Sequence, residues 1–338
     1  MKLSHWLFTV ALFTGLVACE TEEKQAPVNL YEAAPTNSVL LAELNNVTAF
    51  QRAYNSNKVN QNLRLSAYFK DFESVLSNFT APLSSESLNG FLNKRKLLVS
   101  VMLSGAQKYN ALIITKANPA FESELGNALS QKFKASSLSY SGAKIFAFAD
   151  EANDQTLYIS SYQGLLLISL EKNLIEAGLR QTSSELSLTA NTDFKKLLKT
   201  RNAKDLANVF VNLQELPAWL KAQLPQAETG FLKQLGSWAE LDLQATGNQV
   251  LWSGLLTYPE NQAFFTRVFE NIRAHESMAA QIIPANFSLW VNYNVGNIGE
   301  YQRAYSQYQN QKGDLADYED LLKKLPANAT NLMAAWVD

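Results

Sequence analysis

The chain has 338 residues, of which 47% are hydrophobic and 18% are charged, and its formal net charge is −2 at neutral pH. A protein without a basic excess cannot neutralise a row of phosphates, so we exclude nucleic acid as an expected partner. The composition is that of a globular protein, and the length suffices for two ordinary domains or for one large domain with an appendage.

The amino terminus has the pattern of an export signal. Lys2 supplies positive charge next to the free amine, and a mostly apolar run follows from Trp6 to Leu16. This run covers about a dozen residues, whereas a helix that crosses a bilayer needs about 20. We therefore predict that residues 1–18 are a cleaved signal peptide and not a membrane-spanning helix.

The end of this signal resembles the lipobox of bacterial lipoproteins, with Leu16-Val17-Ala18 immediately before Cys19. The resemblance implies that the Cys19 thiol is alkylated with a diacylglyceryl group and that the signal is cut just before it. Cys19 is the single cysteine of the chain, so a disulfide within the chain is excluded. Two or three acyl chains anchor a protein stably, and we predict that this lipid attaches the chain to the membrane.

The residue after the cysteine bears on the location of the protein. In enteric bacteria an aspartate at this position argues for retention in the inner membrane, whereas this chain has Glu20. We therefore expect the outer membrane of the cell envelope. The sequence leaves open whether the protein faces the periplasm or the cell surface.

The rest of the chain is divided by composition and by an internal repeat. Residues 19–33 are predicted to be an acidic flexible tether, because polar residues dominate its first part and cannot form a core. The order Pro-x-Asn, apolar run, Gln-Arg-Ala-Tyr occurs at 34–54 and again at 283–305. We therefore predict an α+β domain over 34–282 as the first repeat and a partial second repeat over 283–338.

The second repeat ends soon after it begins. Its last residues, 331–337, have the pattern of a strand and correspond to 96–102 in the first copy. Either the chain is truncated there, or this strand completes the sheet of the first domain. We expect truncation.

Apolar alternation and turn residues predict the secondary structure in chain order. The expected strands lie at about 38–44, 96–104, 109–116, 143–149, 156–162, 164–170, 206–213, 237–244 and 249–257. The expected helices lie at about 47–57, 67–79, 119–134, 171–182, 191–200, 214–224 and 259–274. Tight hairpin links are expected at 162–165 and 246–249. This order predicts an α+β fold with mostly antiparallel sheets of strand meanders and helices packed on one face.

The repeated phrase also resembles a family of proteins. The pattern at 34–54 and 283–305 is similar to the opening of uncharacterised envelope lipoproteins of the Bacteroidetes type, which often repeat a Pro-x-Asn-Ser/Thr strand–helix unit. The resemblance implies an envelope location but brings no known activity to this chain.

Few residues could carry chemistry that depends on imidazole or thiol groups. The chain has two histidines, and His5 leaves with the signal, so His275 alone remains. A cation near the carboxyl end of a helix is explained by the helix dipole, which is the reading we give to His275. With Cys19 acylated, no thiol nucleophile is left. We therefore predict no catalytic residue, no metal site and no cofactor.

Paired carboxylates are the remaining enzymatic possibility, since glycosidases need only two. Asp71 and Glu73 are two residues apart on a predicted helix and point in different directions, which argues against joint action. Glu43 is a further candidate on the first strand. Glu240 and Asp242 alternate along a predicted strand and share one face. Charges on strand faces are usually solvated, so a catalytic pair is not the preferred interpretation.

Aromatic residues recur at helical spacing in two places. Tyr301, Tyr305 and Tyr308 form one stripe, and residues 68–72 contain a similar one. Such a stripe could stack on a sugar or contact a protein, but it is more often the core face of an amphipathic helix.

Together these features predict a non-enzymatic envelope lipoprotein that docks another envelope protein or serves as an accessory subunit. The alternative is a binding protein for a hydrophobic or glycan ligand, and a glycosidase-like enzyme ranks third. A long exposed sheet edge would favour docking, a pocket lined with aromatic rings would favour ligand binding, and two carboxylates in one cleft would favour catalysis.

Overall fold

The computed structural model describes residues 29–65, 90–93, 95–105, 108–152, 154–223, 225–273, 281 and 297–324. Its strands are β1 (Leu40–Leu44), β2 (Leu97–Gly105), β3 (Lys108–Lys116), β4 (Lys134–Tyr140), β5 (Ala143–Asp150), β6 (Gln155–Tyr162), β7 (Leu165–Ser169), β8 (Ala207–Asn212), β9 (Trp238–Thr246) and β10 (Gln249–Thr257). Its α-helices are α1 (Val47–Ser56), α2 (Lys58–Leu63), α5 (Pro119–Ser130), α6 (Lys172–Thr182), α7 (Thr192–Leu198), α8 (Leu216–Gln223), α10 (Ile298–Lys312) and α11 (Leu315–Lys324), and the 3₁₀ helices are η1 (Leu30–Glu32), η2 (Gly230–Gln234) and η3 (Phe265–Phe269).

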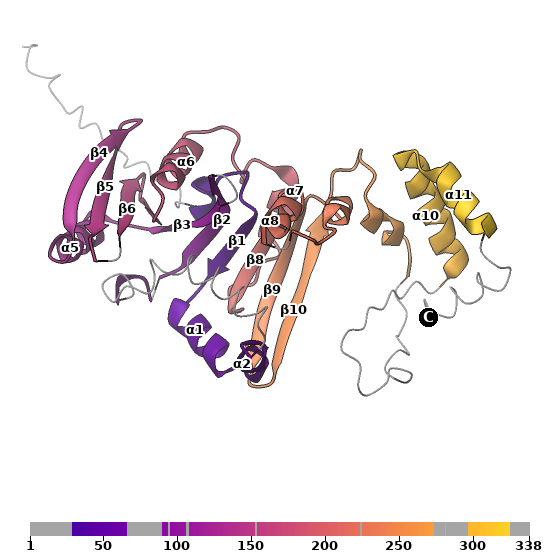
Figure 1. The fold of residues 1–338 in the computed structure, drawn as a ribbon, viewed down its shortest axis with the longest axis horizontal. Coiled ribbons are helices and arrows are strands. Elements are labelled where there is room, and N and C mark those ends of the chain that lie inside the picture. Colours follow the sequence, from indigo (N-terminus) through magenta and orange to yellow (C-terminus); the bar gives the residue numbers. More distant parts are fainter. Residues whose placement is uncertain are drawn as a thin grey trace, which may run out of the picture.

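The described strands form one sheet in the order β10-β9-β8-β1-β2-β3-β7-β6-β5-β4. Every neighbouring pair is antiparallel. The α+β class with an antiparallel sheet is therefore confirmed. The first strand in the chain lies inside the sheet, between β2 and β8, and the outer strands are β4 and β10 (Figure 1).

Helices cover both faces of the central strands, whereas the sequence predicted one face. One core cluster joins sheet residues such as Leu98 to α6 and α7, and the other joins their neighbours, such as Leu97, to α1 and α5. The reason is visible in β7, where all five residues, Leu165–Ser169, are buried. A strand that is apolar on both faces needs cover on both.

Local sequence signals account for the helix starts. An asparagine side chain accepts a backbone N–H in the first turn of several helices, which satisfies a donor that the helix itself leaves unpaired. These capping residues are Asn46 for α1, Asn57 for α2, Asn118 for α5 and Asn191 for α7. Pro119 follows its cap directly, at the position where proline costs no hydrogen bond.

Turn chemistry explains the hairpins. Both predicted links, at 162–165 and 246–249, join antiparallel neighbours. In the first, Gln163 and Gly164 have φ of 50° and 75°, the left-handed pair that a tight two-residue hairpin requires. Ser141 and Gly142 repeat this conformation between β4 and β5, a hairpin that apolar alternation does not predict because β4 is polar and exposed.

The last residues of the predicted tether at 19–33 are part of the folded domain. Leu30–Glu32 form η1, and the Tyr31 side chain is only 1% exposed. Its ring lies 5.6 Å from the rings of both Phe194 and Phe210, measured between centroids. These residues therefore belong to the core of the sheet domain.

One predicted helix is also wrong over its described part. The sequence indicated a helix over 259–274, but the structure has only the short η3 there, and the residues from 259 to 264 are not helical. The predicted helix at 67–79 lies outside the described residues. The other predicted helices of the first repeat are present, and most are somewhat shorter than expected.

The internal repeat stays a prediction. Both Gln-Arg-Ala-Tyr segments lie in helices, at 51–54 in α1 and at 302–305 in α10. The apolar runs at 288–294 and 331–337, which would complete the comparison, lie outside the described residues, as do residues 1–18 and Cys19.

Candidate functional site

The first predicted carboxylate, Glu43, is held by a structural network. Its side chain is 2% exposed and accepts a hydrogen bond from the Tyr31 hydroxyl at 3.2 Å. Two cations pair with it, Lys96 at 2.9 Å and Arg201 at 3.2 Å. Burial and the nearby carboxylate raise the pKa of Tyr31, which keeps the hydroxyl protonated as a donor. These contacts join η1 and the segment after α7 to β1.

A second acidic cluster lies on the same face of the sheet, along β8 and β9. Glu43 is directly opposite Asn208, which is itself opposite Asp242. Glu240 lies two residues from Asp242 on β9, opposite Phe210, and is 1% exposed. As predicted, Glu240 and Asp242 share a face, but Glu240 is buried where a solvated position was expected.

The carboxyl groups of Glu240 and Asp242 have pKa values above the usual range of such groups. Burial first, and then the adjacent Asp242 carboxyl, raise the pKa of Glu240 to about 7. The Thr200 hydroxyl lies 3.4 Å from one oxygen of Glu240. Oxygens of Glu240, Asp242 and Asp205 are buried without a hydrogen-bond partner. Burial, together with the neighbouring carboxyl groups, therefore favours retention of a proton by this cluster near neutral pH.

This cluster does not have the arrangement of a glycosidase site. Retaining and inverting enzymes separate their carboxyl groups by about 5 to 10 Å so that a sugar or a water fits between them. Glu240 is instead 1% exposed, and α7 packs against β9 and β10 beside it, so the pair is not open to a substrate. Within the described part of the chain, no group of three or more His, Cys, Asp or Glu side chains is placed to hold a metal ion. Asp71, Glu73 and His275 lie outside the described residues.

The tyrosine stripe of α10 is used for packing. Tyr301 stacks on Tyr305 with ring centroids 5.9 Å apart, and Tyr305 also contacts Phe265 and Tyr318. Tyr308 is 5% exposed and donates a hydrogen bond to the Gln234 side chain at 2.7 Å. The rings thus join α10 to η3, η2 and α11, which agrees with the core-face interpretation.

A pocket of about 520 Å³ lies between η3 and α10. Charged residues line much of it, including Arg267, Glu270, Glu300 and Arg303. Of the tyrosine stripe, Tyr308 alone reaches its lining. Sites for hydrophobic or glycan ligands are usually lined by apolar and aromatic groups, so this pocket gives the ligand-binding alternative little support.

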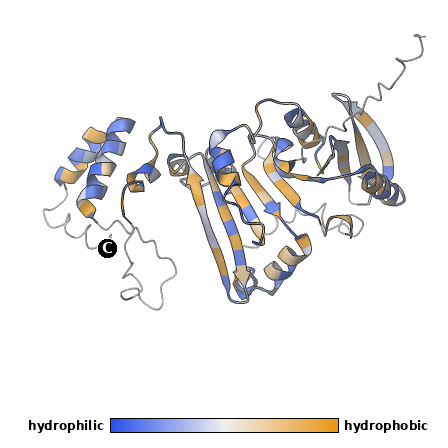
Figure 2. Ribbon diagram, turned by 180° about the vertical axis from the view of Figure 1, so that it is seen from behind, coloured by the Kyte–Doolittle hydropathy of each residue, from blue (hydrophilic) through white to orange (hydrophobic). Residues whose placement is uncertain are grey.

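The outer strand β10 differs from these features because it is both apolar and exposed. Leu251, Trp252 and Leu255 are 55%, 49% and 56% exposed, and Ser253 and Gly254 between them are exposed as well. No residue of β10 is charged. Figure 2 shows hydrophobic colour along much of the strand, at the margin of the sheet. β9 is its one partner among the described strands, so the outer row of backbone groups meets no described strand.

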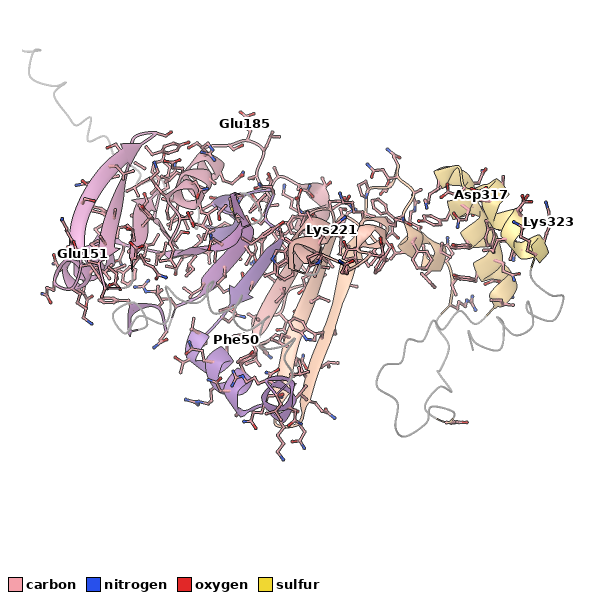
Figure 3. All side chains as sticks on the ribbon, in the orientation of Figure 1. Phe50, Glu151, Glu185, Lys221, Asp317 and Lys323 are labelled. Atoms are coloured by element: carbon pink, nitrogen blue, oxygen red, sulfur yellow. The ribbon has the colours of Figure 1, made fainter. Side chains whose placement is uncertain are left out.

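The outer strand at the opposite margin of the sheet, β4, is polar where β10 is apolar. β4 begins with Lys134 and contains three serines. Lys134 pairs with Glu151 at 4.0 Å, and Figure 3 shows Glu151 at this end of the molecule, far from β10. A lysine and polar side chains on an outer strand discourage pairing with another chain. The protein therefore protects one edge of the sheet and leaves the other apolar.

β10 is hydrogen-bonded along its whole inner side. It pairs with β9 along all nine residues, from Gln249 to Thr257. The Asn57 side chain donates to the backbone oxygens of Thr246 and Gln249 on the two sides of the hairpin. A Cβ added to Gly254 would lie 1.8 Å from the carbonyl oxygen of Glu240, so the two strands meet here at a distance that only glycine permits.

The comparisons with known proteins give no relative: no family model, no curated protein and no solved structure matches this chain. No helix in the described residues has the length and apolar composition needed to cross a membrane.

The strand at 249–257 was expected from the sequence, but its place at the edge was not, because edge position depends on the order of all the strands.

Proposed function

We propose that the chain is a membrane-anchored envelope lipoprotein with a non-enzymatic docking role, in which the β10 edge of the sheet receives a strand of a partner protein. The single observation that carries the proposal is the exposed, uncharged, apolar edge strand over 249–257. An edge of this kind is a template for strand addition, in which main-chain hydrogen bonds supply affinity and alternate side chains supply specificity.

The lipid at Cys19 is the second part of the proposal. Its support is the lipobox pattern of residues 16–19 and the placement of the single cysteine there. The anchor would hold the sheet domain at the outer membrane, where confinement raises the effective concentration of an envelope partner.

The two alternatives have less support in the geometry. A ligand-binding role would need a pocket lined by aromatic rings, and the stripe of α10 is packed against η3 and α11. A glycosidase would need two separated carboxylates open to substrate, and Glu240 is 1% exposed.

Site-specific photocrosslinking in intact cells tests the docking role. A photoreactive phenylalanine analogue is placed at Trp252, and a matched probe is placed at Ser137 in the centre of the polar edge strand β4. Both positions are exposed strand residues at opposite margins of the sheet. We expect a discrete protein adduct from position 252 and none from position 137. Equal labelling from both positions, or no adduct from 252, would contradict the proposal.

A further inference from the structure

Around Ser253, three of the four residue pairs of β10 are alike in character, and the pair next to Ser253 joins a large residue with a glycine. Reading outward from Ser253, the strand has Trp252 and Gly254, then Leu251 and Leu255, and then Val250 and Leu256, with Gln249 and Thr257 at its ends. An antiparallel pair of two such strands centred on Ser253 would place each residue opposite its counterpart in this series.

We propose that the partner of the β10 edge is a second copy of this chain, paired antiparallel with its dyad at Ser253. This inference rests on the proposed function, since it names the partner of the same edge. Residues 251–255, which are all exposed, are the five centred on that dyad. An interface of this kind is isologous, because each copy offers the same strand to the other.

The side chains fit this register on both faces of the strand. Trp252 would lie opposite Gly254 of the other copy, and an aromatic ring over a cross-strand glycine is a stabilising pair. On the other face, Leu251 of each copy would lie opposite Leu255 of the other, which gives two leucine pairs, one on each side of the Ser253 pair. All of these residues belong to the exposed part of the strand.

Charge also favours a second copy over an unrelated segment. In this register a charged residue at or next to Ser253 would lie close to the same charge of the other copy, which would weaken the pairing. The strand contains none. The polar strand β4, which carries Lys134, is not symmetric in this way.

The size of the contact sets the expected strength. Stable dimers bury about 800 Å² on each partner, and a single added strand provides less than this. We therefore expect weak pairing in dilute solution and efficient pairing on a membrane, where the lipid confines both copies. The contact would join two ten-stranded sheets into one continuous sheet.

Cysteine crosslinking of the intact chain in its own envelope tests the register. In the dyad-centred pair, the two Ser253 Cα atoms would be about 4.5–5.5 Å apart, within the range of about 4.4–6.8 Å that a disulfide spans. Ser253→Cys should therefore give a disulfide-linked dimer of this chain. Ser137→Cys on β4 is the matched control and should remain monomeric, as should the unaltered chain.

A second pair of variants reports the alignment of the strands. In the proposed register, Leu251→Cys of one copy lies opposite Leu255→Cys of the other copy. The two copies of residue 251 are about 14 Å apart, because four residues at about 3.4 Å each separate them along the strands. Differently tagged copies that carry one substitution each should crosslink when they are expressed together. Neither variant alone should crosslink.

The outcomes separate this inference from the proposed function. A Ser253→Cys adduct with a different protein, without a dimer of this chain, would overturn the second copy and leave the docking role standing. Dimers from Ser137→Cys as strong as those from Ser253→Cys would show random collision and would overturn the inference. If Ser253→Cys gives no adduct and Trp252 gives no photoadduct either, both proposals fail.

Discussion

Replacement of Glu240 by glutamine should stabilise the protein at alkaline pH. The carboxyl group is 1% exposed, and its pKa rises from 4.5 to about 7, mainly through burial. A group whose pKa is raised by folding binds its proton more tightly in the folded state. Its favourable contribution is therefore complete below about pH 4.5 and is lost as the pH rises through about 7.

The magnitude follows from the size of the pKa rise. At 1.36 kcal/mol per unit, a rise from 4.5 to about 7 corresponds to about 3 kcal/mol lost in full above pH 7. Because Glu240 and Asp242 titrate together, this cost belongs to the pair. Glu240→Gln keeps the shape and removes the charge, so it should recover much of that cost at pH 8 and little at pH 4.5.

Urea unfolding of the full chain between pH 4.5 and 9 measures this effect. The difference in unfolding free energy between Glu240→Gln and the unaltered protein should grow with pH, while the dependence on urea stays the same. Glu151→Gln is the control, because that side chain is 78% exposed and should change the pH profile little. A Glu240→Gln profile parallel to that of the unaltered protein would refute the buried-acid explanation.

Three further changes test other parts of the structure. Phe194→Ala removes a fully buried ring that contacts Tyr31 and Trp238, and it should cost about 3–5 kcal/mol in urea unfolding; a loss below about 1 kcal/mol would contradict its central place in the core. Gly254→Ala should destabilise the β9–β10 hairpin, seen as faster amide exchange over 238–257, because a methyl group would clash with the Glu240 carbonyl; unchanged exchange would show that the strands can separate freely. Cys19→Ser should abolish palmitate labelling and signal cleavage, and labelling that persists would exclude the predicted lipid anchor.

The strands were largely predictable because their signal is local. Runs rich in Val, Ile and Leu mark β2, β3 and β7, and each lies close to its expected range. β4 was missed because Ser136, Ser137 and Ser139 remove that signal, and an outer strand tolerates such residues since it needs no buried face. Tyr31 was missed for a different reason, since a single aromatic residue after a polar segment has no periodicity to indicate burial.

The arrangement of the strands could not be read from local patterns. β1 pairs with β8, where Leu44 is opposite Ala207, and this contact between distant parts of the chain decides which strands end at the edges. The contacts of Glu43 and Glu240 could not be predicted from local patterns either. Their neighbours in sequence identify a strand, but Arg201 and Thr200, which contact them, come from the segment that follows α7.

Hydrogen exchange of the β10 amides is the most direct test of strand addition at this edge. The exchange of residues 249–257 is measured by mass spectrometry in the intact envelope and in dilute protein purified in detergent, with residues 134–140 of β4 as the internal reference. We expect the β10 segment to exchange at least about tenfold more slowly in the envelope, which corresponds to about 1.4 kcal/mol of added protection, while the β4 segment exchanges equally in both. Equal exchange of 249–257 in the two samples would contradict the proposal that this edge binds a partner strand.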